Sequence, residues 1–596
     1  MHYRLGILGL LFTVLAAAAA PTVADDDVQS LVQDSRYWAT DGGNYSNWRY
    51  SGLYQINNKN IGDLQAAWTM ATGSLQGQAG GPLVLPAAET GLNAPAVFVH
   101  TPFPDAVLAF NLDQLKFGWI YESGQRQSSL LQQCCGYRTR GLAYADGMLF
   151  LQQADDRLVA LQAGSGKTLW ATEGSDSGIP RQVTGLPLPV GNYLLAGFTT
   201  SSRSGISAYQ SSTGKPVWRA FNSGTDADTL FDTQTRFVSG KSTDLGSIQT
   251  SGFTDEQATV SSTGPMAWDP QQNLVYYAGI TPLSRDATTG KNLYAMALYA
   301  RDLETGKARW VYQLTPDGGT YYREPGELIL ADISIDGAQV AVVVHFSSNG
   351  FVYIINRSTG ELLQARKFDT SVNWAAAINM DTGRPVRDED EKAVHDAVCP
   401  SPIGAKGDEP AAFSPRTGLF YVPVRHTCMG TRLLNAAPNP SLASAPQTAP
   451  EPATPAAQQS TPQVETFLLP AGTVMKDGTT NMGMLVAWDS THTQPAWTVA
   501  EPWPVMSGVL VTAGDTVFYG TLDGYLKAVD AQTGAPLWQF KLPSGVIGDI
   551  STWSYKDKQY IGVLSGSGDS TALLGGDESL QLPVRPGGTL MVFSLP

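Results

Sequence analysis

Two adjacent cysteines, Cys134 and Cys135, are the residues whose type and spacing most strongly suggest chemistry. The chain has only four cysteines, so neighbours by chance are rare. A disulfide between neighbours closes a small, strained ring, because disulfides prefer more widely separated backbones. Such strain persists where the surrounding structure enforces it, and it gathers at ligand sites. The pair therefore indicates a rigid loop at a ligand site if it is bonded, and two unrelated buried thiols if it is not.

Other familiar catalytic patterns are absent from the sequence. The six histidines show no zinc-like spacing, and the chain contains neither a Gly-x-Ser-x-Gly elbow nor a Cys-x-x-Cys-His haem-attachment motif.

The N-terminus predicts export to the periplasm. His2 and Arg4 precede an apolar run, and a small-residue cleavage site ends at Ala24, so residues 1–24 are expected to be a signal peptide. The apolar run is short for a membrane span, and no later stretch reaches spanning length. The compartment is oxidising, so the four cysteines can form two disulfides; besides the adjacent pair, Cys399 and Cys428 remain.

The formal net charge of −15 argues against nucleic acid as a partner, because neutralising phosphates requires clustered Lys and Arg. This charge fits a soluble exported protein. It does not identify a partner.

A repeated pattern predicts the architecture. A strand is followed by a Thr-Gly or Ser-Gly turn and by a strand that ends in Trp. The full copies end at Trp170, Trp218, Trp310 and Trp538, a weaker copy ends at Gln364, and Trp68, Trp119 and Trp497 end similar strands without the full turn. Units about fifty residues long with four short strands each are typical of β-propeller blades. Each Gly permits a positive φ in the turn, and each Trp is expected to join neighbouring blades through its ring and its N–H.

These eight units predict one all-β domain over residues 25–596. Alternating apolar runs at 148–151, 274–277 and 517–520 fit its strands, and 589–596 is expected to close the ring beside the first blade. The long gaps from Trp218 to Trp310 and from Gln364 to Trp497 should hold insertions. Residues 436–463, rich in Ala, Pro, Gln, Ser and Thr, are expected to be a disordered insertion.

Several long segments give the chain a family resemblance. They are Arg49–Asn57, His100–Pro104, Cys134–Gly147, Val372–Trp374, Thr417–Pro423 and Gly520–Asp530. From about residue 28 onward the chain resembles the periplasmic PQQ-dependent methanol and alcohol dehydrogenases, especially the lanthanide-dependent methanol dehydrogenases. The resemblance implies an eight-bladed propeller of four-stranded antiparallel blades with tryptophan-docking motifs. It also implies a Cys134–Cys135 disulfide over a quinone ring and a second disulfide between Cys399 and Cys428.

The chemistry of this family needs groups that this sequence lacks. A carboxylate base takes the alcohol proton, and a Ca²⁺ or lanthanide ion polarises the quinone. Tyr321 occupies the position of the base, and Thr281 and Arg323 occupy metal-ligand positions. A third ligand position lies within residues 178–225, which contain no Asp or Glu. A phenol near its ordinary pKa is a poor base at neutral pH, and a guanidinium repels a metal ion.

Several quinone contacts of the family are replaced in this sequence. Ser348 occupies the position of an arginine that contacts the quinone. The aromatic floor of the site aligns near Thr263, and two further contacts align with Met506 and Gly407.

Four cofactor-shell positions match the family, namely Cys134, Cys135, Arg140 and Thr184. Arg140 also fits a structural ion pair and Thr184 an ordinary strand residue. Arg323 could stand where the metal would lie, leaving a metal-free ligand site, or it could be a surface arginine near the mouth of the central funnel.

Three functions remain open. We expect a non-catalytic homologue that binds a small molecule or a periplasmic protein, with PQQ binding undecided and no Ca²⁺ or lanthanide ion. The alternatives are an active PQQ-dependent alcohol dehydrogenase with an altered site, which would pass electrons to cytochrome c, and a periplasmic scaffold or assembly protein. A homodimer is one of the assemblies that the sequence leaves open.

Overall fold

The computed structural model describes residues 27–124, 141–153, 157–172, 186–199, 203–238, 264–280, 296–314, 325–386, 397–434, 463–469, 473–474, 477–568 and 582–596. The predicted signal peptide, residues 1–24, lies outside these ranges. The predicted insertion, residues 436–463, also lies outside them except for Gln463, which begins a strand. Within the described residues, no helix is long and apolar enough to cross a membrane.

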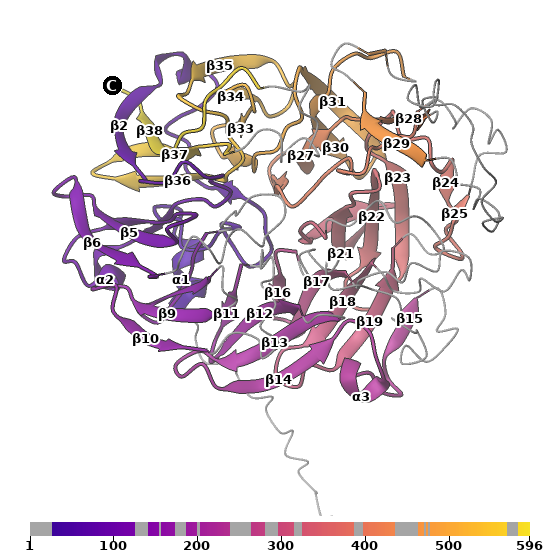
Figure 1. Ribbon diagram of the computed structural model, residues 1–596, viewed down its shortest axis with the longest axis horizontal. Helices are drawn as coiled ribbons and strands as arrows, with labels where there is room; N and C mark the ends of the chain where they lie inside the picture. The colour runs from indigo at the N-terminus through magenta and orange to yellow at the C-terminus, as the bar shows by residue number, and fades with distance from the viewer. Residues whose placement is uncertain are drawn as a thin grey trace, which may run out of the picture.

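The strands form eight four-stranded antiparallel blades around a central axis, which confirms the predicted propeller (Figure 1). The first four blades, from the innermost strand outward, are β3 (Leu83–Leu85), β4 (Ala96–His100), β5 (Ala106–Asn111) and β6 (Lys116–Glu122); β7 (Ala143–Ala145), β8 (Met148–Gln152), β9 (Leu158–Gln162) and β10 (Thr168–Ala171); β11 (Leu188–Val190), β12 (Tyr193–Thr199), β13 (Ser204–Gln210) and β14 (Pro216–Phe221); and β16 (Ala267–Asp269), β17 (Leu274–Ile280), β18 (Met296–Asp302) and β19 (Ala308–Gln313).

The other four blades are β20 (Ile329–Ile335), β21 (Ala338–Phe346), β22 (Phe351–Asn356) and β23 (Leu362–Lys367); β26 (Ala412–Phe413), β27 (Leu419–Arg425), β30 (Gly483–Asp489) and β31 (Gln494–Glu501); β32 (Leu510–Thr512), β33 (Thr516–Gly520), β34 (Tyr525–Asp530) and β35 (Pro536–Lys541); and β36 (Ile550–Tyr555), β37 (Lys558–Ser565), β38 (Thr589–Ser594) and β2 (Gln65–Ala71). The last blade closes the ring, because β38 from the C-terminus pairs with β2 from the N-terminus (Figure 1). The predicted closure by residues 589–596 is therefore confirmed, since β2 is the strand that carries Trp68, the first tryptophan of the repeat.

Smaller elements occupy the two long gaps that the repeat spacing predicted. In the first gap, β15 (Arg236–Val238) adds a parallel fifth strand to the fourth blade. Outside the gaps, β1 (Tyr50–Ser51) adds a parallel strand to the seventh blade. The second gap holds two hairpin sheets, β24 (Ala377–Ile378) with β25 (Pro385–Val386) and β28 (Met429–Leu434) with β29 (Gln463–Leu468). The short helices are α1 (Asp27–Gln33), η1 (Ile61–Asp63), α2 (Ala87–Thr90) and α3 (Asp226–Thr229).

Burial follows position within a blade. Inner strands such as β4 and β33 are buried at every residue, because neighbouring blades cover both of their faces. Outer strands such as β31 alternate between exposed and covered residues, as a half-buried strand should.

The joints between blades are built as the sequence predicted. The Trp170 Nε1–H donates to the Ser211 carbonyl of the next blade at 3.0 Å. Its ring lies over Gly214, where a Cβ would stand 2.5 Å from a ring atom. The same pairing joins Trp119 to Gly166, Trp218 to Gly306, Trp310 to Gly360 and Trp497 to Gly534. The tryptophans thus hold neighbouring blades together.

An N-terminal segment, residues 36–51, crosses the inner ends of the blades. Its backbone bonds to inner strands from several blades, through Trp38 to Val84, Tyr45 to Trp268, Ser46 to Leu330, Trp48 to Phe413 and Arg49 to Val511. The Tyr45 hydroxyl also donates to the Pro189 carbonyl at 2.9 Å. This segment therefore brings its own polar side chains to the centre of the ring.

Candidate functional site

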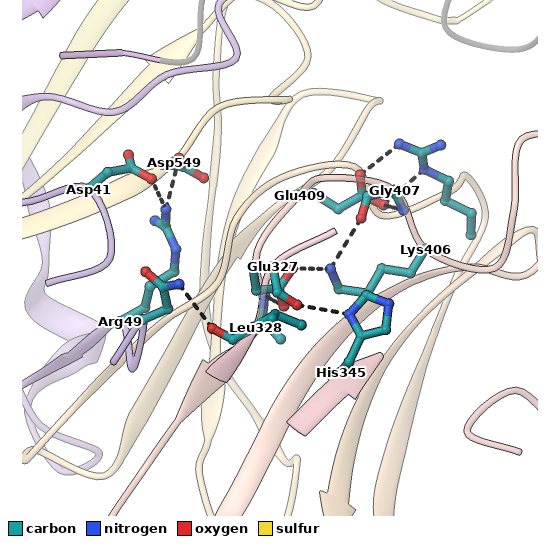
Figure 2. Close-up of polar contacts among 12 residues, drawn as sticks. Asp41, Arg49, Glu327, Leu328, His345, Lys406, Gly407, Glu409 and Asp549 are labelled. Atoms are coloured by element: carbon teal, nitrogen blue, oxygen red, sulfur yellow. Dashed lines mark hydrogen bonds and ion pairs between the residues drawn. The ribbon is translucent and has the colours of Figure 1, made fainter. Parts of the chain in front are cut away.

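A buried lysine and glutamate form the core of a charged cluster near the centre of the propeller (Figure 2). Glu327 precedes β20, and Lys406 lies in the connection that leads to β26. The Lys406 Nζ lies 2.5 Å from the Glu327 carboxylate, and both side chains are almost completely buried. The Ala411 N–H donates to the other Glu327 oxygen at 3.0 Å, so this carboxylate is paired at both oxygens.

A second pair lies beside the first. Arg425, the last residue of β27, donates to both oxygens of Glu409 at 2.8 and 2.7 Å. Burial alone would raise the pKa of Glu409, but the charges of Arg425 and Lys406 hold it below its usual value. The Glu409 carboxyl is therefore ionised at neutral pH.

The N-terminal segment supplies a third cation. The Arg49 guanidinium lies between Asp41 and Asp549, with 3.1 Å between its Nη2 and the Asp549 carboxylate (Figure 2). Arg49 is buried and has a positive φ of 48°, which is uncommon for a residue with a side chain. The crossing backbone thus places this arginine where the two aspartates neutralise it.

A neutral histidine completes the cluster. The His345 Nδ1 lies 3.0 Å from the Glu327 carbonyl, so this nitrogen carries the hydrogen. Burial lowers the pKa of His345 to about 4, and the nearby Lys406 charge acts in the same direction. Its Nε2 has no hydrogen-bond partner within the described part of the chain. This nitrogen could accept a hydrogen bond from a ligand.

A pocket lies between the N-terminal segment and the inner strands of the second to fourth blades. It encloses about 460 Å³, including its opening to solvent, and its lining is mixed polar and apolar. The lining residues are Thr40, Asp41, Gly42, Asn44, Tyr45, Asn47, Leu142, Ala143, Tyr144, Leu186, Pro187, Leu188, Pro189, Pro265 and Met266. Asp41 is shared with the Arg49 pair, so the pocket adjoins the charged cluster.

Of the sequence-predicted positions, Ser348 is brought to the cluster. Ser348 is buried, and its carbonyl accepts the Ala405 N–H at 2.8 Å, next to Lys406. Its Oγ has no hydrogen-bond partner among the described residues. Gly407 also lies here, since its carbonyl accepts from the Lys406 Nζ at 3.2 Å. Met506 instead packs in an apolar group with Leu522 and Ile547.

The remaining predicted site residues lie outside the described ranges: Cys134, Cys135, Arg140, Thr184, Thr263, Thr281, Tyr321 and Arg323. Gly141 is the first described residue after Arg140, and Leu186, two residues after Thr184, lines the pocket. The second disulfide, Cys399–Cys428, is present as the resemblance implied.

The sequence did not single out Lys406, Glu327, Arg425, Glu409 or Arg49 as a cluster. Lys406 and Glu327 are 79 residues apart, and Arg49 and Asp549 are 500 apart, so no local spacing connects them. The available signal was weaker: Lys406 stands between glycines in Gly404-Ala-Lys-Gly407, and Arg49 between aromatic residues. Charges in such settings are candidates for burial.

Comparison with known proteins gives the family of this architecture. The beta-propeller domain of glucose, ethanol and alcohol dehydrogenases matches residues 38–169, 187–367 and 385–561. A second propeller family, outer membrane protein assembly factor BamB, matches residues 119–251.

Individual relatives match over nearly the whole chain. The dehydrogenase XoxF of Paracoccus denitrificans is 38% identical, over 99% of this chain and 98% of its own. A lanthanide-dependent methanol dehydrogenase of Methylorubrum extorquens is 36% identical, over 97% and 98%. The solved structure of a europium-containing methanol dehydrogenase superposes with a TM-score of 0.82 at 33% identity, covering 96% of this chain and all of that one. The chain belongs to the PQQ-dependent methanol and alcohol dehydrogenase family.

Proposed function

We propose that this chain is a periplasmic member of the family that binds a small organic molecule at the centre of the propeller and does not carry out metal-assisted alcohol oxidation. One observation carries the proposal: each of the four carboxylates of the described centre, the buried Asp549, Glu327 and Glu409 and the partly buried Asp41, is paired with Lys or Arg.

These pairings make the described centre a poor metal site. A Ca²⁺ or lanthanide ion needs several oxygen ligands, mostly carboxylates and carbonyls. Here Lys406, Arg425 and Arg49 already occupy the carboxylate oxygens, so a metal ion could use these ligands only by displacing a buried lysine or arginine. At the positions implied by the family resemblance, Thr281 and Arg323 replace metal ligands and Tyr321 replaces the base.

The ligand is expected to be an organic molecule with polar atoms. The His345 Nε2 and the Ser348 Oγ are buried polar atoms without partners in the described structure, and the adjoining pocket has a partly apolar lining. Cys134, Cys135, Arg140 and Thr184 are retained positions of the cofactor shell, so the quinone PQQ itself is the first ligand to test.

The test is a PQQ titration of the purified protein, followed by tryptophan fluorescence, with and without Ca²⁺ or La³⁺. We expect the affinity to be independent of either metal and the loaded protein to reduce no dye in the presence of methanol or ethanol. Binding that requires metal, together with alcohol-dependent dye reduction, would overturn the proposal. It would establish the alternative that near-full-length similarity to dehydrogenases favours, an active enzyme, whose acceptor by analogy with methanol dehydrogenase [cytochrome c] subunit 1 is a cytochrome c.

A further inference from the structure

His426 lies where three segments of the chain meet. It follows β27, and its ring is completely buried. The Nδ1 atom lies 2.7 Å from the Asp369 Oδ1, in the connection after β23. The Nε2 atom lies 2.7 Å from the Thr479 Oγ1, in the segment before β30. A single ring therefore links connections from the fifth and sixth blades.

The Nδ1 atom must carry a hydrogen. A carboxylate oxygen can only accept hydrogen bonds. The Asp369 Oδ1 already accepts from the Ser371 N–H at 2.9 Å and from the Ser371 hydroxyl at 2.8 Å. Because this oxygen already acts as an acceptor for both Ser371 groups, it accepts from the ring as well, and the ring nitrogen beside it is a donor.

The Nε2 atom carries a hydrogen as well. The Thr479 hydroxyl has one hydrogen, and it donates this to the Asp477 Oδ1 at 2.7 Å. Thr479 therefore presents a lone pair to Nε2. The other Asp477 oxygen lies 3.5 Å from Nε2 and accepts from the Thr370 hydroxyl. With both nitrogens donating, the ring is an imidazolium cation.

The charges around the ring agree with this assignment. The charged groups that face it are Asp369 from the connection after β23 and Asp477 from the segment before β30. Burial alone would lower the pKa of His426, but the hydrogen bond and charge of Asp369 and the charge of Asp477 raise it above its ordinary value. The Asp369 Oδ2 is buried and has no hydrogen bond among the described residues, so this carboxylate depends on the charge of the ring.

The ligand atoms of Asp369, His426 and Asp477 lie within 4.8 Å of one another, but their arrangement around the ring does not favour a shared metal ion. An ion bonds to an imidazole through one nitrogen, whereas Asp369 and Asp477 flank opposite nitrogens of His426. The geometry instead fits a ring that carries a hydrogen on each nitrogen.

We propose that protonated His426 is a clamp that holds the connection after β23 and the segment before β30 together as one wall of the central site, and that loss of its proton as the pH rises releases this wall. The wall is continuous with the charged cluster. The neighbouring Arg425 binds Glu409 through its side chain, and its N–H donates to the Ala405 carbonyl at 2.7 Å. The clamp acts in this way whether or not a quinone binds.

The direction of the pH effect follows from the protonated state. The folded form holds the His426 proton more tightly than the unfolded chain, so the clamp is complete at pH values below the unfolded pKa. It weakens as the pH rises through the folded-state pKa. Because one proton is released, the open population should then grow about tenfold per pH unit.

Nuclear magnetic resonance of protein labelled with ¹⁵N at histidine tests the charge directly. We expect both His426 nitrogens to be protonated at neutral pH, and equimolar Zn²⁺ to leave their signals unchanged. An unprotonated nitrogen, or a Zn²⁺-dependent shift of these signals, would overturn the proposal. This experiment uses the unmodified protein, and a T479V variant assigns the signals through its local shift.

Amide hydrogen exchange tests whether the segment before β30 is released when His426 loses its proton. Protection factors of residues 477–481 should fall about tenfold per pH unit above the transition, and T479V should move the transition to lower pH. The control is H492Q, because His492 also pairs with a carboxylate, that of Asp489, but lies on the surface with 70% of its side chain exposed. H492Q should behave as the parent protein. The proposal would be contradicted if the protection factors did not change with pH, or if T479V showed its transition at the same pH as the parent protein.

Discussion

The blade joints and the centre of this propeller both bury polar groups, but they do so over different distances in the sequence. At the joints, a tryptophan bonds to a carbonyl of the next blade, as Trp170 does to Ser211 across 41 residues. In the centre, Arg49 meets Asp549 across 500 residues. The joints repeat one contact, whereas each central pair is made once. A substitution at one joint therefore leaves the other joints intact, whereas a substitution of a central charged residue leaves its buried partner without a counter-charge.

One joint already illustrates this independence. The fifth blade has Gln364 where other blades have Trp, and the corresponding turn glycine of the next blade, Gly418, has open space where a Cβ would stand. The ring still closes. The centre offers no comparable replacement within the described residues, since each buried carboxylate of the cluster has a cation beside it.

The largest expected effect is in the centre. Lys406→Met leaves Glu327 buried and unpaired, which should cost about 3 to 5 kcal/mol of unfolding free energy. Chemical denaturation measures the change. Lys307→Met is the matched control, because Lys307 pairs with Asp232 at the surface and should lose only about 0 to 1 kcal/mol. Adding Glu327→Gln to Lys406→Met should restore most of the loss. Equal losses in the two lysine variants would contradict a buried ion pair.

Acid should affect the centre next most strongly, through His345. Its pKa falls from 6.5 in the unfolded chain to about 4 in the folded protein, so the unfolded chain binds more protons between these values. Stability should therefore decrease as the pH falls from 6.5 to 4, by about 3 kcal/mol from this residue. Unfolding measured across this range should show a smaller slope for His345→Gln than for the parent. If His345→Gln keeps the parent slope while His492→Gln flattens it, the buried neutral histidine is not the cause.

The smallest expected effect is a difference in stability between glycine variants at two blade joints. Gly214→Ala and Gly418→Ala both place a side chain at a positive φ, 70° and 72°. The backbone cost should be about 1 to 2 kcal/mol in each. Only at Gly214 does the new Cβ meet a ring, 2.5 Å from Trp170. Gly214→Ala should thus be the less stable variant in thermal unfolding, and equal midpoints would show that the tryptophan does not constrain this joint.

The sequence predicted the parts of the fold that depend on local repetition. Thr213-Gly214 and Trp218 recur with short spacing, so the blades, their number and their joints follow from pattern alone. Ring closure was predicted as well, because residues 589–596 read as a strand without a partner of its own, and this strand pairs with β2.

The candidate site was less accessible to prediction. Ser348 was located through the family resemblance, but Lys406 and Arg49 belong to it through contacts that no spacing encodes. The role of His426 could not be predicted from the sequence either, because its partners Asp369 and Asp477 lie 57 and 51 positions away in the chain.

The central claim is that this centre pairs its carboxylates with lysine and arginine and holds no catalytic metal. The most direct measurement is the metal content of the protein purified from periplasm of cells grown with Ca²⁺, La³⁺ and PQQ available. The account predicts far less than one Ca²⁺ or lanthanide ion per chain, whether or not quinone is bound. One tightly held ion per chain, retained through chelation and required for alcohol oxidation, would contradict it.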